Sequence, residues 1–211
     1  MSHVATNAGT VARPAVFTLR RFVYPPPERC ELCRASLPAT HAHLLELNSG
    51  ELRCACSQCL KAFDGDNPEF RAVAPRKEKL GSLHLSDAEW DAFQIPIDLA
   101  FLVRGERGLR ALYPGPAGIV QSAGAAPGWN DLVSINDVLR DLKPEVEALA
   151  IDRVRGRRDA YLLSIDHCYA LTGVIRSQWH GLSGGPAVWD AIGAYFTDAN
   201  AVPSRGTAGH A

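Results

Sequence analysis

The stretch CELCRASLPATHAHLLELNSGELRCACSQC, residues 30–59, contains five of the six cysteines of the chain. Four of them form two Cys-x-x-Cys pairs, Cys30 with Cys33 and Cys56 with Cys59, and 22 residues separate the pairs. This spacing is close to that of four-thiolate zinc sites. Two intervening residues bring both sulfurs of a pair onto one turn, so each pair can hold one side of a tetrahedral ion at about 2.3 Å. The stretch therefore predicts a small metal-binding module.

The four thiolates favour zinc, because they suit a soft tetrahedral site and need no redox machinery to load. The same sulfurs suit a single iron, as in rubredoxin-like sites, or an iron-sulfur cluster, and the fifth cysteine keeps that alternative open. Cys54 lies two positions before Cys56, so in a strand both side chains point to the same face. Cys54 is therefore a further candidate for the metal site. It either supports the ligands without binding the metal itself, or it binds the metal in place of Cys56. His41 and His43 stand close enough in sequence to enter the site, although a loop histidine is more often merely exposed.

A hairpin is predicted between the two cysteine pairs. Strand candidates at residues 43–47 and 51–54 flank the turn signal Asn48-Ser49-Gly50. So small a module cannot be stabilised by burial alone, and a metal is the expected staple. We expect a flexible segment over 1–24, a zinc-ribbon-like module over 25–64, a linker or loop over 65–83, an α+β domain over 84–199 and a disordered tail over 200–211.

The second domain is predicted to be an antiparallel sheet with helices packed on one side, which makes the fold class α+β. Apolar runs with turn signals between them predict strands at 99–103, 109–113, 119–122, 146–154 and 160–165. Helical spacing of apolar residues predicts helices over 130–142, 166–179 and 186–196, and Ser86-Asp87-Ala88-Glu89 predicts a capping box before a short helix.

The composition is that of a folded globular protein, with 46% hydrophobic and 21% charged residues. A formal net charge of −1 argues against a nucleic-acid partner. The first twenty residues hold no apolar segment of a secretory signal, and no apolar run is long enough to span a membrane. We therefore expect a cytoplasmic protein, in which clustered thiols stay reduced and indicate a metal or catalysis.

Two other patterns resemble catalytic motifs. Gly181-Leu182-Ser183-Gly184-Gly185 matches the nucleophile elbow of hydrolases, but a predicted helix precedes it where that elbow needs a strand. A turn between helices, with Ser183 as a cap, is the better interpretation. Asp166, His167 and Cys168 are consecutive, so on a helix they point in different directions and cannot relay a proton. We interpret Cys168 as a small buried residue and His167 as an exposed one, which leaves no catalytic constellation.

Five motifs together carry a resemblance to a known family: Cys30-Glu31-Leu32-Cys33, His41-Ala42-His43-Leu44-Leu45, Cys54-Ala55-Cys56 with Cys59, Tyr113-Pro114-x-Pro116-Ala117-Gly118, and Trp179-His180-Gly181 with the glycine-rich turn after it. From about residue 25 to 196 the chain resembles an uncharacterised bacterial family found beside genes for high-affinity nickel-iron hydrogenases. The resemblance implies a non-catalytic accessory protein whose partner is a hydrogenase subunit or maturation factor. An electron-transfer protein with bound iron and a hydrolase using Ser183 remain the alternatives.

Overall fold

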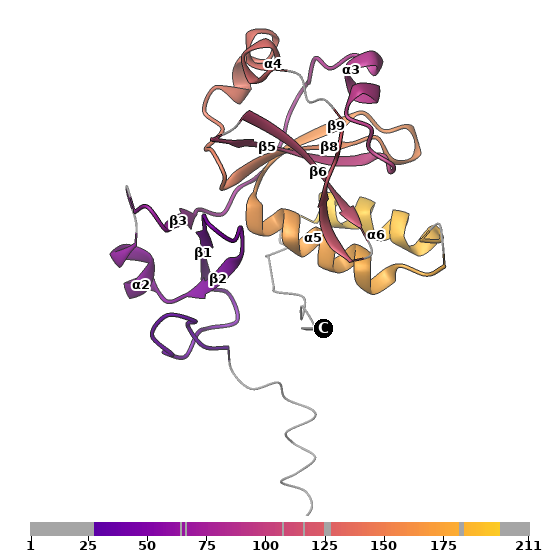
Figure 1. Cartoon of the computed structure of the whole chain (residues 1–211). Coiled ribbons are helices and arrows are strands. Elements are labelled where there is room, and N and C mark those ends of the chain that lie inside the picture. Colours follow the sequence, from indigo (N-terminus) through magenta and orange to yellow (C-terminus); the bar gives the residue numbers. More distant parts are fainter. Residues whose placement is uncertain are drawn as a thin grey trace, which may run out of the picture.

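Two antiparallel sheets organise the chain, as the computed structural model shows (Figure 1). The structure describes residues 28–63, 65, 67–106, 108–115, 117–124, 128–181 and 184–198. The predicted α+β class with antiparallel sheets is confirmed. The segments expected to be flexible or disordered, 1–24 and 200–211, lie outside the described residues.

The smaller sheet belongs to the cysteine-rich stretch. Its strands are β1 (Ala42–Glu46), β2 (Leu52–Ala55) and β3 (Phe70–Val73), in the order β2-β1-β3, and a short helix, α2 (Ser57–Ala62), follows β2. The predicted hairpin is present, with Gly50 at a φ of 71° in its turn, where glycine is favoured. His43 therefore lies directly opposite Cys54 in the β1–β2 pairing.

The larger sheet has six strands in the order β4-β9-β8-β5-β6-β7, and each neighbouring pair is antiparallel. These strands are β4 (Lys77–Lys79), β5 (Leu99–Gly105), β6 (Gly108–Gly115), β7 (Gly118–Gln121), β8 (Glu147–Asp152) and β9 (Asp159–Ser164). All five strands predicted for this domain are found, and β4 joins them at one edge.

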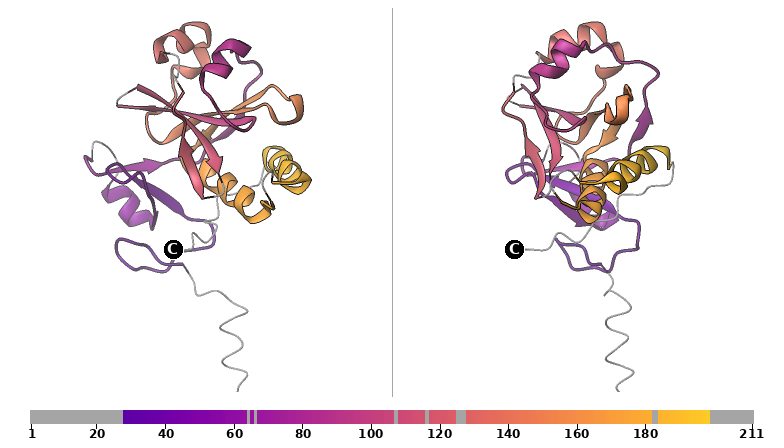
Figure 2. Two further views of the ribbon diagram at one scale, coloured as in Figure 1. Left: turned by 45° about the vertical axis from the view of Figure 1, so that its right-hand side comes forward. Right: turned by 90° about the vertical axis from the view of Figure 1, so that its right-hand side faces the viewer.

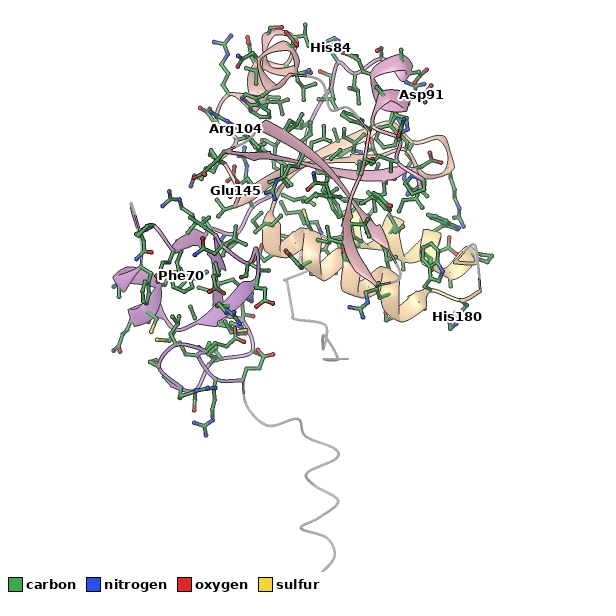
Figure 3. All side chains as sticks on the ribbon, viewed as in Figure 1. Phe70, His84, Asp91, Arg104, Glu145 and His180 are labelled. Atoms are coloured by element: carbon green, nitrogen blue, oxygen red, sulfur yellow. The ribbon has the colours of Figure 1, made fainter. Side chains whose placement is uncertain are left out.

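Helices cover both faces of the larger sheet, so the expectation of helices on one side is wrong (Figures 1 and 2). On one face lie α5 (Ile165–Gln178) and α6 (Pro186–Thr197), and on the other lie α3 (Asp87–Ala92) and α4 (Trp129–Ile135). Side chains fill the space between the sheet and the helices on both faces (Figure 3). The physical reason is visible in β5, where five consecutive apolar residues, Leu99 to Val103, are fully buried. A strand buried on both faces reads as a continuous apolar run and does not alternate.

The helix predicted over 130–142 ends early. After α4 the chain turns at Asn136 and continues as a 3-10 turn, η1 (Asp137–Leu139). The amide of Asn136 donates to the carbonyl oxygens of His84 and Leu132, and its oxygen accepts from the N–H of His84. These bonds tie the loop before α3 to the end of α4, and sequence periodicity does not report them.

The segment expected to be a linker or loop, residues 65–83, instead contains β3 and β4. β3 pairs with β1 in the smaller sheet, and β4 pairs with β9 in the larger one. Both strands are short and carry charged residues, which hides them from a search for apolar alternation. The segment therefore holds the two sheets together.

The smaller sheet also packs on the larger domain. Leu45 of β1 and Val73 of β3 belong to the same buried cluster as Leu171 and Ile175 of α5. The first half of α5 also contacts the β1–β2 hairpin, because Asp166 lies 3.2 Å from Nδ1 of His43 and the Tyr169 hydroxyl donates to the Gly50 carbonyl at 2.8 Å. Over the described residues, no helix is both long and apolar enough to cross a membrane.

Candidate metal centre

The first cysteine pair lies on a tight turn. Arg34 N–H donates to the Cys30 carbonyl at 2.8 Å, and Cys30 N–H donates to the Ala35 carbonyl at 2.8 Å. Arg34 adopts a φ of 67°, in the left-handed region that closes such a turn. This geometry turns the Cys30 and Cys33 side chains to the same side, with Cys30 buried and Cys33 exposed.

The second pair lies at the start of α2. Cys56 is the residue that caps the helix, and its sulfur accepts from the main-chain N–H of Cys59 at 3.5 Å. A thiol is not among the preferred capping groups, whereas a thiolate carries charge and suits the positive end of the helix. The cap thus favours the deprotonated sulfur that metal ligation needs.

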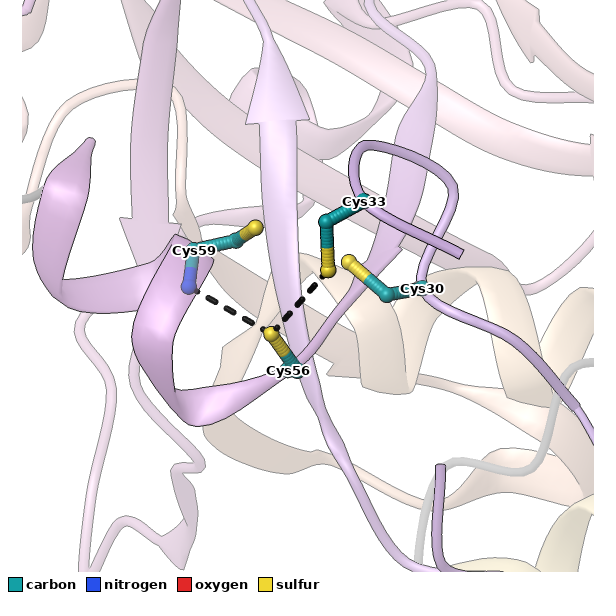
Figure 4. Close-up of side chains that lie close together, drawn as sticks. All are labelled: Cys30, Cys33, Cys56 and Cys59. Carbon is teal, nitrogen blue, oxygen red and sulfur yellow. Dashed lines mark hydrogen bonds between the residues drawn. The ribbon is translucent and has the colours of Figure 1, made fainter. Parts of the chain in front are cut away.

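The four sulfurs of Cys30, Cys33, Cys56 and Cys59 converge, each within 4.8 Å of the others. Figure 4 shows them turned toward one another, with Cys33 Sγ and Cys56 Sγ 3.6 Å apart. Sulfurs at about 2.3 Å from a tetrahedral zinc lie roughly 3.8 Å from each other. The arrangement is therefore close enough to hold one metal ion. None of the six cysteines, all of which the structure describes, forms a disulfide.

The surroundings of these thiols shift their pKa values in opposite directions. Burial raises the pKa of Cys30, but main-chain N–H groups of Cys33 and Cys56 outweigh it and lower the pKa to about 6. Loss of solvent, together with hydrogen bonds to the neighbouring sulfurs, raises the pKa of Cys59 to about 12. Four thiolates cannot share so small a space without a cation to balance their charge. A bound metal removes this conflict.

The packing around the four sulfurs is slight. The cluster's buried residues are Cys30, Leu37 and Cys54, with Leu32, Cys56 and Cys59 packed against them. Glu31 joins the two halves, because its N–H donates to the Cys54 carbonyl at 2.9 Å and its carboxylate accepts from the Cys54 N–H at 2.7 Å. The first cysteine turn is thereby fixed to β2.

Cys54 is not part of the group of four sulfurs that could share one metal ion. Its sulfur lies with His41 and His43 in a second group. His41 and His43, which the sequence offered as possible ligands of the four-cysteine site, also belong to this second group. In a continuous strand Cys54 and Cys56 would share a face. They separate because β2 ends at Ala55 and Cys56 already caps the helix α2.

The other candidate motifs separate in space. Asp166 accepts from the main-chain N–H of His167, but its side chain lies 3.2 Å from Nδ1 of His43. His167 is buried, which corrects the expectation that it is exposed, and its Nδ1 lies 2.7 Å from the Tyr195 hydroxyl. The whole first turn of α5 is buried between the two sheets. Cys168 is fully buried, as expected, and burial raises its pKa. Ser183 lies outside the described residues.

The pairing of Asp166 with His43, 123 residues away, was not predicted from the sequence. The pairing of Cys54 with His43 could have been predicted, since the turn at residues 48–50 fixes which residues of the hairpin lie opposite each other.

A family described as a family of unknown function (DUF5947) matches residues 29–202 of the chain. This range includes both cysteine pairs and the whole larger sheet. No curated protein and no solved structure matches the chain.

Proposed function

The chain belongs to the family of unknown function DUF5947, and we propose that it is a non-catalytic accessory protein whose four-cysteine module holds one structural zinc ion. The observation that carries the proposal is the convergence of four sulfurs from two separate turns within 4.8 Å. A site of four thiolates is closed, with no open position for substrate, and sites of this kind stabilise folds.

Zinc is the proposed ion because four sulfurs in a tetrahedral arrangement suit zinc or iron, and nothing at the site calls for redox chemistry. The fifth cysteine, which kept iron open, lies with the two histidines. The metal would take the place of a hydrophobic core, since, among the described residues, Leu37 is the only large apolar one that is buried in this cluster.

The proposed partner is a subunit or a maturation factor of a nickel-iron hydrogenase. This part of the proposal rests on the resemblance drawn from the sequence motifs. The module projects beside the larger domain (Figures 1 and 2), so its outer turns are accessible to another protein. Residues 33–36 and 38–40 of the first turn are exposed. The zinc would stiffen these turns into one docking surface, which lowers the entropic cost of binding.

Metal analysis and affinity capture in the native host test the two parts separately. The full chain is purified for elemental analysis, and the same tagged chain is used to capture partners from cells that make the hydrogenase. Cys56→Ser should lose the zinc ion of the four-cysteine site and the captured partner together. Cys168→Ala, which changes a buried cysteine on α5 outside the site, should keep both.

Each outcome has a defined meaning. Iron in place of zinc would contradict the structural-zinc proposal and support electron transfer. Zinc without enrichment of any hydrogenase component would refute the partner and leave the metal site standing. Capture that is equally strong for Cys56→Ser would show that the module is not the docking surface.

A further inference from the structure

A second group of metal-ligating side chains lies in the same module. His41, His43 and Cys54 each offer one ligand atom, and these atoms lie within 4.8 Å of one another. The imidazole rings of the two histidines have centroids 4.9 Å apart. The side chains of His41 and His43 are 4% and 6% exposed, and Cys54 is 4% exposed. Three such groups buried together need a physical reason, because each loses hydration.

Backbone geometry explains why the three meet. His41 and His43 are two positions apart along an extended segment, so their side chains share a face. Cys54 lies directly opposite His43 in the antiparallel β1–β2 pair, and directly opposed residues have neighbouring side chains on the same face. The grouping is therefore fixed by the register of the hairpin.

The hydrogen bonds of the two imidazoles have the form that metal-ligating histidines show. Nδ1 of His43 lies 3.2 Å from the carboxylate of Asp166, which Ser164 Oγ and the His167 N–H also hold in place. Nδ1 of His41 lies 3.1 Å from the Pro38 carbonyl and 3.3 Å from the Glu28 carboxylate. A carboxylate or carbonyl on one ring nitrogen fixes the tautomer and leaves the other nitrogen to bind metal.

The remaining nitrogen of His41 supplies an independent sign of a missing partner. Its Nε2 is buried and has no hydrogen-bond partner among the described residues. Buried polar atoms in folded proteins are almost always satisfied, and an orphan calls for an ion or water. A bound ion would satisfy it.

We infer that Nε2 of His41, Nε2 of His43 and Sγ of Cys54 form a second metal site, which takes a divalent transition-metal ion such as zinc. Two imidazoles and one thiolate are ligands that zinc accepts. Ligands of a tetrahedral zinc lie roughly 3.3 to 3.8 Å apart, within a small side-chain adjustment of the distances here. Three protein ligands leave one coordination position open, in contrast to the four-cysteine site.

The same residues have the order of a cysteine nucleophile with its histidine and aspartate: Cys54, His43, Asp166. A nucleophile must be reached by substrate, and Cys54 is buried. Two surface pockets over the described residues are lined by other segments, one at residues 79–83 with 158–160 and one at residues 80–82 and 84 with 135–138. A nucleophilic pair also gives no role to the buried nitrogen of His41. The metal site accounts for all three groups.

Counting bound ions on the intact full-length chain tests the inference. Metal-free protein is titrated with zinc and examined by native mass spectrometry, and cobalt is used in parallel to report thiolate ligation by its charge-transfer absorption. We expect two ions on the unmodified chain, one on His41→Gln, on His43→Gln and on Cys54→Ala, and one on Cys56→Ser. The ion that the histidine variants retain at the four-cysteine site reports that their module is folded.

Two control variants should leave the ion count unchanged, and a third variant measures the affinity of the second site. His84→Gln changes a histidine on the α4 side of the larger sheet (Figure 3), and Cys168→Ala changes a buried cysteine of α5. Both should bind two ions. Asp166→Asn keeps every ligand but weakens the support of His43, so affinity at the second site should fall about 10- to 100-fold while affinity at the four-cysteine site stays unchanged.

The outcomes separate this inference from the proposed four-cysteine site. A single ion on the unmodified chain that disappears in Cys56→Ser and persists in His43→Gln would overturn the second site alone. A single ion with the reverse dependence would support the second site and refute the first. Equal counts for the unmodified chain and the His41, His43 and Cys54 variants would overturn the inference. Fast alkylation of Cys54 in the folded chain, unaffected by zinc, would favour the nucleophile.

Discussion

Removing the metal should unfold the cysteine turns and leave the larger sheet intact. The perturbation is a chelator added to the zinc-loaded full-length chain. The turns at residues 28–40 and 54–63 have little apolar packing to hold them, whereas the central strands β5 and β8 of the larger sheet are buried on both faces.

The magnitude follows from what each part buries. Among the described residues, Leu37 is the one large apolar side chain buried in the cluster with the cysteines, and burying a leucine contributes about 1.5–3 kcal/mol. Structural zinc in small peptide domains contributes roughly 10–16 kcal/mol at neutral pH. Metal binding thus exceeds local burial several-fold. β1 and β3 should survive, because Leu45 and Val73 pack in the core shared with α5.

Hydrogen exchange measured by mass spectrometry reports both regions in one experiment. Amides in peptides covering 30–37 and 56–63 should lose protection on chelation, while those of β5 and β8 should keep it. Cys168→Ala serves as the control and should behave like the unmodified chain. If both cysteine turns keep their protection in a sample shown to have lost its metal, the metal does not hold these turns in place.

Three further predictions concern the larger domain. Ser86→Ala removes the capping box seen at the start of α3 and should cost about 1 kcal/mol in urea unfolding; no change would show that the cap does not contribute. Asn136→Ala removes three hydrogen bonds to main-chain groups of His84 and Leu132 and should cost about 1–3 kcal/mol, more than an exposed substitution such as Asp137→Ala. Burial lowers the pKa of His167 in the folded state, so the unfolded chain binds more protons just below pH 6.5. The free energy of unfolding should therefore fall as the pH drops through this window. His167→Gln should flatten this dependence on pH.

The sequence predicted most of the elements because their signals are local. The two Cys-x-x-Cys pairs, the turn at residues 48–50 and the capping box at Ser86 depend on neighbouring residues alone. Each is present in the structure.

Features that depend on distant partners were not predicted. The early end of α4 depends on bonds between Asn136 and the loop at His84, and β4 exists only through its pairing with β9. The helices on both faces were signalled by the continuous apolar run of β5, but that run was interpreted only as a strand. Assigning its two faces requires the sheet order, which no local pattern contains.

The site was predicted in part for the same reason. Spacing identified the four cysteines, but it did not separate Cys54 from them, because that depends on where β2 ends and α2 begins. The support of His43 by Asp166 joins strand β1 of the smaller sheet to the first turn of helix α5, and no local sequence pattern signals it.

X-ray absorption at the zinc edge, measured on the His41→Gln/His43→Gln variant, reports the ligands of the four-cysteine site alone, because only that site can then hold zinc. We expect four sulfur neighbours at about 2.3 Å and no nitrogen or oxygen neighbour. Fewer than four sulfurs, or a histidine or water in the coordination shell, would contradict this expectation.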